Sequence, residues 1–131
     1  MSNGKEVTDS TFNIMQNGTD FEVGLTGYSG NAGNQTTLVL DWPNDSNKIA
    51  IVYVDTHYDE FKYVNSHNLF YSVVDRKGNK GLGKVIEKNN KVFTHIMSPS
   101  QLTACRHANG KRLVDCKKSV FTDTKFKIFI N

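Results

Sequence analysis

The sequence predicts a mainly β protein: an antiparallel β-sandwich or closed barrel of about eight to ten short strands, with one short helix near 99–108. Short runs in which apolar and polar residues alternate recur along the chain, which is the two-residue period of strands with one buried face. Clusters of Gly, Asn and Asp punctuate these runs at turns. A length of 131 residues suits one core. We therefore expect a single β-rich domain over 1–131, with 1–10 as a candidate flexible N-terminal arm.

The first expected element is a β-hairpin over residues 11–28. Apolar and polar residues alternate on both sides of Asn17 and Gly18, and both of these residues tolerate the positive φ of a tight turn. The next stretch, 28–35, is rich in Gly and Asn and is expected to form a loop.

Two strands of the core are expected next. Leu38, Leu40 and Trp42 share one face of a strand that ends at Pro43, because proline has no amide proton for a sheet ladder. Residues 48–54 form a continuous, mostly apolar run that is rich in β-branched side chains and is too short for a helix. This run predicts a central strand covered on both faces.

The middle of the chain is expected to continue as strands and turns. Residues 55–68 fit either a helical turn or an edge strand. A hairpin loop is expected over 75–81, and a second turn at Lys88-Asn89-Asn90. The strands between these turns are expected at 69–74, 82–87 and 91–97.

The expected helix rests on its end signals. Ser98 is a capping residue, Pro99 suits the first helical position, and Gln101 follows three residues after the cap. Asn109-Gly110 supplies a stop, so 99–108 is predicted to be helical. The alternative is a β-hairpin that turns at Asn109-Gly110-Lys111-Arg112.

The two cysteines, Cys105 and Cys116, bear on the compartment. A disulfide between them would close a short loop and stabilise the fold by roughly 3 kcal/mol. In the alternative hairpin, Cys105 faces Cys116. Such a bond persists in an oxidising compartment, whereas two unpaired and partly buried thiols are the other possibility. We expect a secreted chain without its leader, with an intracellular location as the alternative.

Other signals of compartment are weak or negative. The sequons at Asn17, Asn34 and Asn44 are close to the roughly two that this composition yields by chance. The longest apolar run, 49–54, is far shorter than the roughly 20 residues of a membrane-spanning helix, so no transmembrane segment is expected.

Charge is distributed unevenly along the chain. Three lysines against nine carboxylates give residues 1–74 a net charge of −6, and 13 basic against four acidic residues give residues 75–131 a net charge of +9. Basic side chains gathered on one face would attract an anionic ligand. The alternative is that strands from the two halves interleave and neutralise one another. The candidate basic residues are Arg76, Lys77, Lys80 and Lys84.

Aromatic residues beside polar loops suggest sugar recognition, since sugars present C–H faces and many hydroxyl groups. The candidates are Tyr28, Trp42 and Tyr58, with Phe61 and Tyr63 nearby. The alternative for Trp42 is a place in the core, because it is in phase with Leu38 and Leu40.

Two weaker patterns concern chemistry. Asp55, His57 and Asp59 would lie on one face of an extended chain and so form a weak candidate for a metal site, although further ligands are not identifiable. Histidines with a nearby cation suit metal-independent RNA cleavage, and His57, His95 and Arg106 are the candidates.

The favoured interpretation is a small secreted recognition module, effector- or lectin-like, that binds a glycan or another host surface molecule without catalysis and without a cofactor. An anionic ligand is also possible through the basic half of the chain. One alternative is a small ribonuclease-like toxin, and another is a structural subunit of a virion or fibre. The oligomeric state is not predicted.

Overall fold

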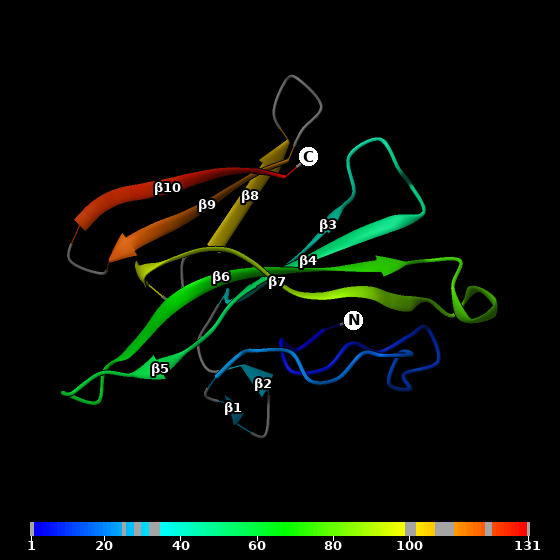
Figure 1. The fold of residues 1–131 in the computed structure, drawn as a ribbon, viewed down its shortest axis with the longest axis horizontal. Coiled ribbons are helices and arrows are strands. Elements are labelled where there is room, and N and C mark those ends of the chain that lie inside the picture. The colour runs from blue at the N-terminus through cyan, green and yellow to red at the C-terminus, as the bar shows by residue number, and fades with distance from the viewer. Residues whose placement is uncertain are drawn as a thin grey trace.

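A computed structural model of the chain describes residues 2–24, 26–27, 30–31, 35–98, 102–106, 112–119 and 122–130. In this part of the chain the fold is mainly β, as the sequence predicts (Figure 1). One short 3-10 helix, η1 (Asn79–Gly81), interrupts the strands. The ten described strands are β1 (Thr26–Gly27), β2 (Gly30–Asn31), β3 (Thr37–Asp41), β4 (Lys48–Val54), β5 (His57–Tyr58), β6 (Val64–Asp75), β7 (Lys84–Met97), β8 (Leu102–Arg106), β9 (Arg112–Ser119) and β10 (Thr122–Ile130).

A five-stranded antiparallel sheet forms the centre of the molecule. Its order is β3-β4-β6-β5, and β7 also pairs with β6. The register pairs Val54 with Leu69 and His57 with Asn65, so β5 continues along the same edge of β6 as β4. Strand β4 lies between β3 and β6, which confirms the predicted central strand at 48–54.

Both faces of the central sheet are apolar because β4 alternates between two core clusters. Ala50, Val52 and Val54 belong to the first core cluster, whose other buried members are Leu69 and Met97 of the same sheet and Leu102 of β8. Ile51 and Tyr53 belong to the second core cluster, whose other buried members are Val7, Phe21, Val23, Phe70, Val74 and Val85. The first cluster thus lies toward the C-terminal sheet and the second toward the N-terminal segment, residues 2–24 (Figure 1).

The C-terminal strands form a separate antiparallel sheet in the order β10-β9-β8. The prediction of a helix over 99–108 is wrong, because Leu102–Arg106 forms β8 and pairs with β9. Leu102 and Ala104 pack toward the core while Thr103 and Cys105 are exposed, and this two-residue period suits a strand. The alternative prediction of a hairpin is confirmed, because β8 pairs antiparallel with β9, but its prediction that Cys105 faces Cys116 is wrong. Closure of the sheets into a sandwich or a barrel stays a prediction.

The β8–β9 register does not place the two cysteines opposite each other. Cys105 pairs with Leu113, and Cys116 pairs with Leu102. Three register positions correspond to about 10 Å along a strand, which exceeds the Cα separation of a disulfide. Cys105 is a free, exposed cysteine in this structure.

The N-terminal segment differs from its prediction. The prediction of a hairpin over 11–28 is wrong. A turn does form at Asn17, whose φ is 62°. The residue that pairs with the chain after this turn is Val7, whose amide donates to the carbonyl of Gly18 at 2.9 Å, and Val7 lies before the predicted hairpin. Phe12 and Ile14, expected in a strand, are exposed. Val7 is buried in the second core cluster, so the candidate flexible arm over 1–10 is anchored at this residue.

The middle of the chain is more regular than expected. The strands predicted at 82–87 and 91–97 are one strand, β7, because Asn89 adopts φ of 56° within a bulge instead of ending the ladder. In the ambiguous stretch 55–68, β5 and the first residues of β6 form a hairpin, which matches the edge-strand interpretation. The loop predicted at 75–81 joins β6 to β7 and contains η1.

Candidate functional site

A buried polar network of the central sheet lies where β4 passes into β5. Two residues, Asp55 and Thr56, separate these strands, and they lie opposite three residues of β6, numbers 66–68. On the other edge of β6 the register also shifts, between Ser66 and Asn68. Such irregularities re-aim side chains and backbone amides, and they are frequent beside functional sites.

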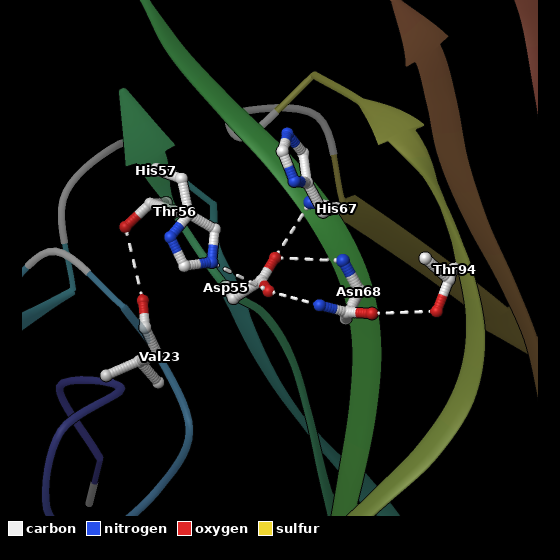
Figure 2. A network of polar contacts seen from close by, with 7 residues as sticks. All are labelled: Val23, Asp55, Thr56, His57, His67, Asn68 and Thr94. Carbon is white, nitrogen blue, oxygen red and sulfur yellow. Dashed lines mark hydrogen bonds and ion pairs between the residues drawn. The ribbon is translucent and has the colours of Figure 1, made fainter. Parts of the chain in front are cut away.

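The carboxylate of Asp55 occupies this irregularity and accepts four hydrogen bonds (Figure 2). The backbone amides of His67 and Asn68 donate to Oδ1 at 2.8 and 2.9 Å. The Nδ2 of Asn68 and the Nε2 of His57 donate to Oδ2 at 2.6 and 3.0 Å. The hydroxyl of Thr94 in turn donates to the Asn68 side-chain oxygen at 2.8 Å. The donors to the carboxylate come from β5 and β6, and the bond from Thr94 to Asn68 extends this network to β7.

These hydrogen bonds keep Asp55 charged although its side chain is only 5% exposed. Burial raises the pKa of Asp55, but the hydrogen bonds from Asn68, His67 and His57 together hold this pKa below its ordinary value. Four donors also use the lone pairs of both carboxylate oxygens, so Asp55 retains little capacity to bind a metal ion.

Two histidines lie beside this carboxylate. The hydrogen bond to Asp55 fixes the ring of His57, whose side chain is 45% exposed. The ring of His67 lies 5.4 Å away, centroid to centroid, at an interplanar angle of 37°. In Figure 2 the ring of His57 contacts the Asp55 carboxylate, whereas His67 contacts it through its backbone amide. A buried carboxylate that orients an exposed imidazole is a chemically competent arrangement for proton transfer.

The turn that joins β5 to β6 is organised by Asp59. Its Oδ1 accepts hydrogen bonds from the amides of Phe61 and Tyr63 at 2.9 and 2.8 Å, and its Oδ2 accepts from the side chain of Asn65 at 3.0 Å. The amide of Asp59 donates to the carbonyl of Tyr63 at 2.9 Å, and Lys62 adopts φ of 62°. The Asp59 carboxylate thus accepts hydrogen bonds from the backbone amides of its own tight turn.

Aromatic side chains on this turn face solvent. Tyr58, Phe61 and Tyr63 are 62%, 78% and 70% exposed. Figure 1 shows the β5–β6 turn projecting at one end of the sheet. We refer to Tyr58 at the end of β5, together with Phe61 and Tyr63 on the turn at 59–63, as the hairpin tip.

The structure separates the metal candidates of the sequence. Asp55 and His57 are in contact, whereas the carboxylate of Asp59 accepts hydrogen bonds from amides of its own turn. Within the described residues, no three His, Cys, Asp or Glu side chains form a group that could hold a metal ion.

The catalytic candidates of the sequence are not brought together either. His57 lies beside His67. His95 lies on β7, where its Nδ1 is 3.0 Å from the carbonyl of Ile96. Arg106 ends β8 and pairs in register with Arg112. The sequence did not predict the contacts of His67 and Asn68 with Asp55, because only the register of β6 brings these residues together.

The ligand-binding candidates fall at different places. Tyr58 belongs to the hairpin tip, and Tyr28 lies outside the described residues. Trp42 is partly buried against the first core cluster, with its ring 6.2 Å from that of Tyr71, as the core interpretation expects.

The basic candidates gather at the β6–β7 turn, which lies at the far end of β6 from the hairpin tip. All four are exposed, and Arg76 donates to the carboxylate of Asp41 at 3.0 Å. We refer to Arg76, Lys77, Lys80 and Lys84 as the basic turn. Because the two sites lie at opposite ends of a strand about 36 Å long, one small ligand cannot contact both.

The structure describes two of the three sequon asparagines, Asn17 and Asn44. The side-chain amide of Asn17 donates to the carbonyl of Val85 at 3.1 Å, and Asn44 is exposed in a turn. Asn34 lies outside the described residues.

Comparisons with known proteins identify no relative. The sequence matches no family model, no curated protein and no solved structure. Among the described residues, no helix is both long and apolar enough to cross a membrane.

Proposed function

We propose that the protein is a secreted recognition module that binds a glycan through the hairpin tip, without catalysis. The observation that carries this proposal is the exposure of three aromatic side chains, Tyr58, Phe61 and Tyr63, at the tip of one hairpin. Soluble proteins rarely leave several large aromatic groups exposed together unless a partner covers them.

The chemistry of the tip suits a sugar. Aromatic faces pack against the C–H faces of sugar rings, while the phenol hydroxyls of Tyr58 and Tyr63 can exchange hydrogen bonds with sugar hydroxyls. The charges on the turn, Asp59, Glu60 and Lys62, sum to −1. This balance favours a neutral glycan over an anionic one, because the described residues form no cationic patch at this end of β6.

The tip is also preorganised. The turn is held by the hydrogen bonds to Asp59, and the hairpin behind it is held by those to Asp55. A rigid loop loses little conformational entropy on binding, so a small contact area yields useful affinity.

A glycan array probed with the wild-type protein and two matched variants tests this proposal. Phe61→Ala removes an aromatic ring from the tip, whereas Phe12→Ala removes an equally exposed ring, 77% against 78%, from the N-terminal segment. We expect Phe61→Ala to abolish glycan binding at micromolar concentration and Phe12→Ala to leave it unchanged. Equal loss in both variants, or a wild-type protein that binds no glycan but captures a protein partner through Phe61, would refute the glycan assignment.

A second candidate function, metal-independent RNA cleavage, is favoured by one specific observation. The imidazoles of His57 and His67 lie side by side, and Asp55 orients the first. In such a reaction one imidazole accepts the proton of the RNA 2′-hydroxyl as this oxygen attacks phosphorus, and the second imidazole protonates the departing 5′-oxygen.

Incubation with RNA decides this candidate. Cleavage that is lost in both His57→Ala and His67→Ala, but retained in His95→Ala, would establish it in place of the non-catalytic module. Absence of cleavage by the wild-type protein removes it and leaves the binding proposal standing.

A further inference from the structure

A second site lies at the opposite end of the central sheet from the hairpin tip. A cavity of about 430 Å³ opens between the N-terminal segment and the β6–β7 turn. Its volume falls within the range of about 300–1,000 Å³ that is usual for small-molecule sites. It shares no residue with the hairpin tip or with the Asp55 network.

The floor of the cavity is apolar. Ile49 and Val74 are register partners on β4 and β6, and both contribute to the second core cluster. Met15 packs against this cluster from the N-terminal segment, and Leu82, which is 38% exposed, closes the floor from the β6–β7 turn. The N-terminal segment therefore leaves part of this apolar face uncovered at the end near the basic turn.

Glycine gives the cavity its shape. Gly81 and Gly83 line it with φ of 89° and 93°, values that side chains rarely adopt. A Cβ at Gly83 would lie 2.8 Å from the terminal methyl group of Met15, so a side chain here would displace the flexible end of Met15 from the cavity wall.

The rim is polar and carries one cation. Thr8, Ser10, Asp9 and Arg76 line it. The carboxylate of Asp9 accepts a hydrogen bond from the Thr11 hydroxyl within its own turn. This bond is the main cause that lowers the pKa of Asp9 from its ordinary value. Arg76 uses one nitrogen for Asp41, and its remaining donors are available to a ligand.

Four basic side chains outnumber the carboxylates of Asp9, Asp41 and Asp75 at this end of the sheet, so the surrounding charge favours an anion. Lys77, Lys80 and Lys84 are exposed on the same turn, and within the described part of the chain none of their ammonium groups joins an ion pair. An anion that approaches this end of the molecule is attracted by the whole basic turn before it contacts Arg76.

We propose that this cavity binds a small amphipathic anion, whose compact apolar body rests on Met15, Ile49, Val74 and Leu82 and whose carboxylate, sulfonate or phosphate group pairs with Arg76. The apolar floor supplies affinity, and the cation fixes the orientation of the ligand. The site is independent of the glycan proposal.

Two fluorescent probes with the same apolar body test the site on the intact chain. Anilinonaphthalene sulfonate carries a negative charge, whereas phenyl-naphthylamine lacks the sulfonate. We expect one sulfonate probe to bind per chain and to bind more tightly than the neutral probe. Equal affinities for the two probes would overturn the proposal.

Three variants locate the binding. Arg76→Gln should weaken binding of the sulfonate probe by about 5-fold, the effect of one solvent-accessible ion pair, and leave the neutral probe unaffected. Lys80→Gln removes a charge from the same turn outside the cavity and should change binding by less than about 2-fold. Ser10→Trp places a bulky ring on the rim and should reduce binding of both probes.

The controls distinguish a built site from general attraction. Equal weakening by Arg76→Gln and Lys80→Gln would show that the turn acts only by its net charge, which overturns the proposal. Unchanged binding by Ser10→Trp, in a variant whose thermal unfolding matches the wild type, would place the probes elsewhere and overturn it as well.

Discussion

Asp55 illustrates how a single buried charge is stabilised. In Asp55→Asn, one acceptor oxygen is replaced by an amide group that faces the amides of His67 and Asn68 or the Asn68 side chain. Because donors are then left without acceptors, we expect the free energy of unfolding at pH 7 to fall by about 2 kcal/mol. Urea unfolding measures this loss. Asp41→Asn, at a carboxylate whose side chain is 65% exposed, is the control and should cost much less.

The same carboxylate predicts a pH dependence. Its folded-state pKa lies below the ordinary value, so its stabilisation is present above the unfolded-state pKa, about 3.9, and is lost as pH falls through the folded-state pKa. The difference in unfolding free energy between wild type and Asp55→Asn should therefore shrink below about pH 4. Urea titrations from pH 7 to pH 3 test this, and a difference that stays constant with pH would contradict it.

At this scale the sequence predicts which residue types meet but not all of their partners. The spacing of Asp55 and His57 predicts two side chains on one face, and they are in contact. Asn68 and Thr94 are 13 and 39 positions away from Asp55 along the chain, so no local pattern relates them. Only the shifted register of β6 brings them together, and register depends on the whole sheet.

Strand β7 depends on one asparagine in its bulge. The side chain of Asn89 accepts from the Glu22 amide and donates to the Asp20 carbonyl, each at 3.0 Å, and also contacts the Tyr53 hydroxyl. It therefore joins the N-terminal segment to the sheet at the point where the strand turns to positive φ.

We expect Asn89→Ala to lower the free energy of unfolding by about 2 kcal/mol, because the change removes these hydrogen bonds and places alanine at an unfavourable φ. Asn90→Ala is the matched control: Asn90 makes one exposed hydrogen bond, to Glu87, so its loss should cost under about 0.5 kcal/mol. Urea unfolding compares the two variants. Equal losses would show that the bulge does not hold the N-terminal segment.

Two elements were mispredicted for related reasons. Lys88-Asn89-Asn90 has the composition of a turn, and Asn89 does adopt turn geometry, but its hydrogen bonds lie across the sheet and the ladder continues. Ser98 and Pro99 match a helix start, yet Leu102 and Ala104 alternate in phase with a core that the sheet has already built. In both cases tertiary packing decides between two local signals.

The β8–β9 hairpin makes a prediction about thiol chemistry. Cys105 is exposed and its register partner is Leu113, so we expect it to be alkylated by iodoacetamide in the folded protein without a reductant. Mass spectrometry of native material measures this. A mass two units lower than the reduced chain, with no alkylation, would establish the disulfide with Cys116 and reject this register.

At the scale of the molecule, β6 separates two different surfaces. Its first residues carry the hairpin tip, and its last residues lead into the basic turn. The basic turn stands at one end of the sheet, where Asp41 pairs with Arg76, while the carboxylates of Asp55 and Asp59 are occupied at the other end. Composition indicates an anion-attracting surface, but only the fold shows that it lies away from the aromatic residues.

The two core clusters, on opposite faces of β4, imply that the described chain unfolds as one unit. Trp42, the single tryptophan, packs on the first cluster, whereas Val7 is buried in the second. We expect Val7→Ala to cost about 2 kcal/mol through lost burial and a residual cavity, and Val39→Ala, at a site that is 56% exposed, to cost less than half as much.

Urea unfolding followed by Trp42 fluorescence and by circular dichroism tests whether the faces are coupled. If β4 couples them, both signals of Val7→Ala shift to lower urea by the same amount, although Trp42 lies on the opposite face from the change. A fluorescence midpoint that stays at the wild-type value while the circular dichroism transition splits would mean that the N-terminal segment unfolds separately from the sheet.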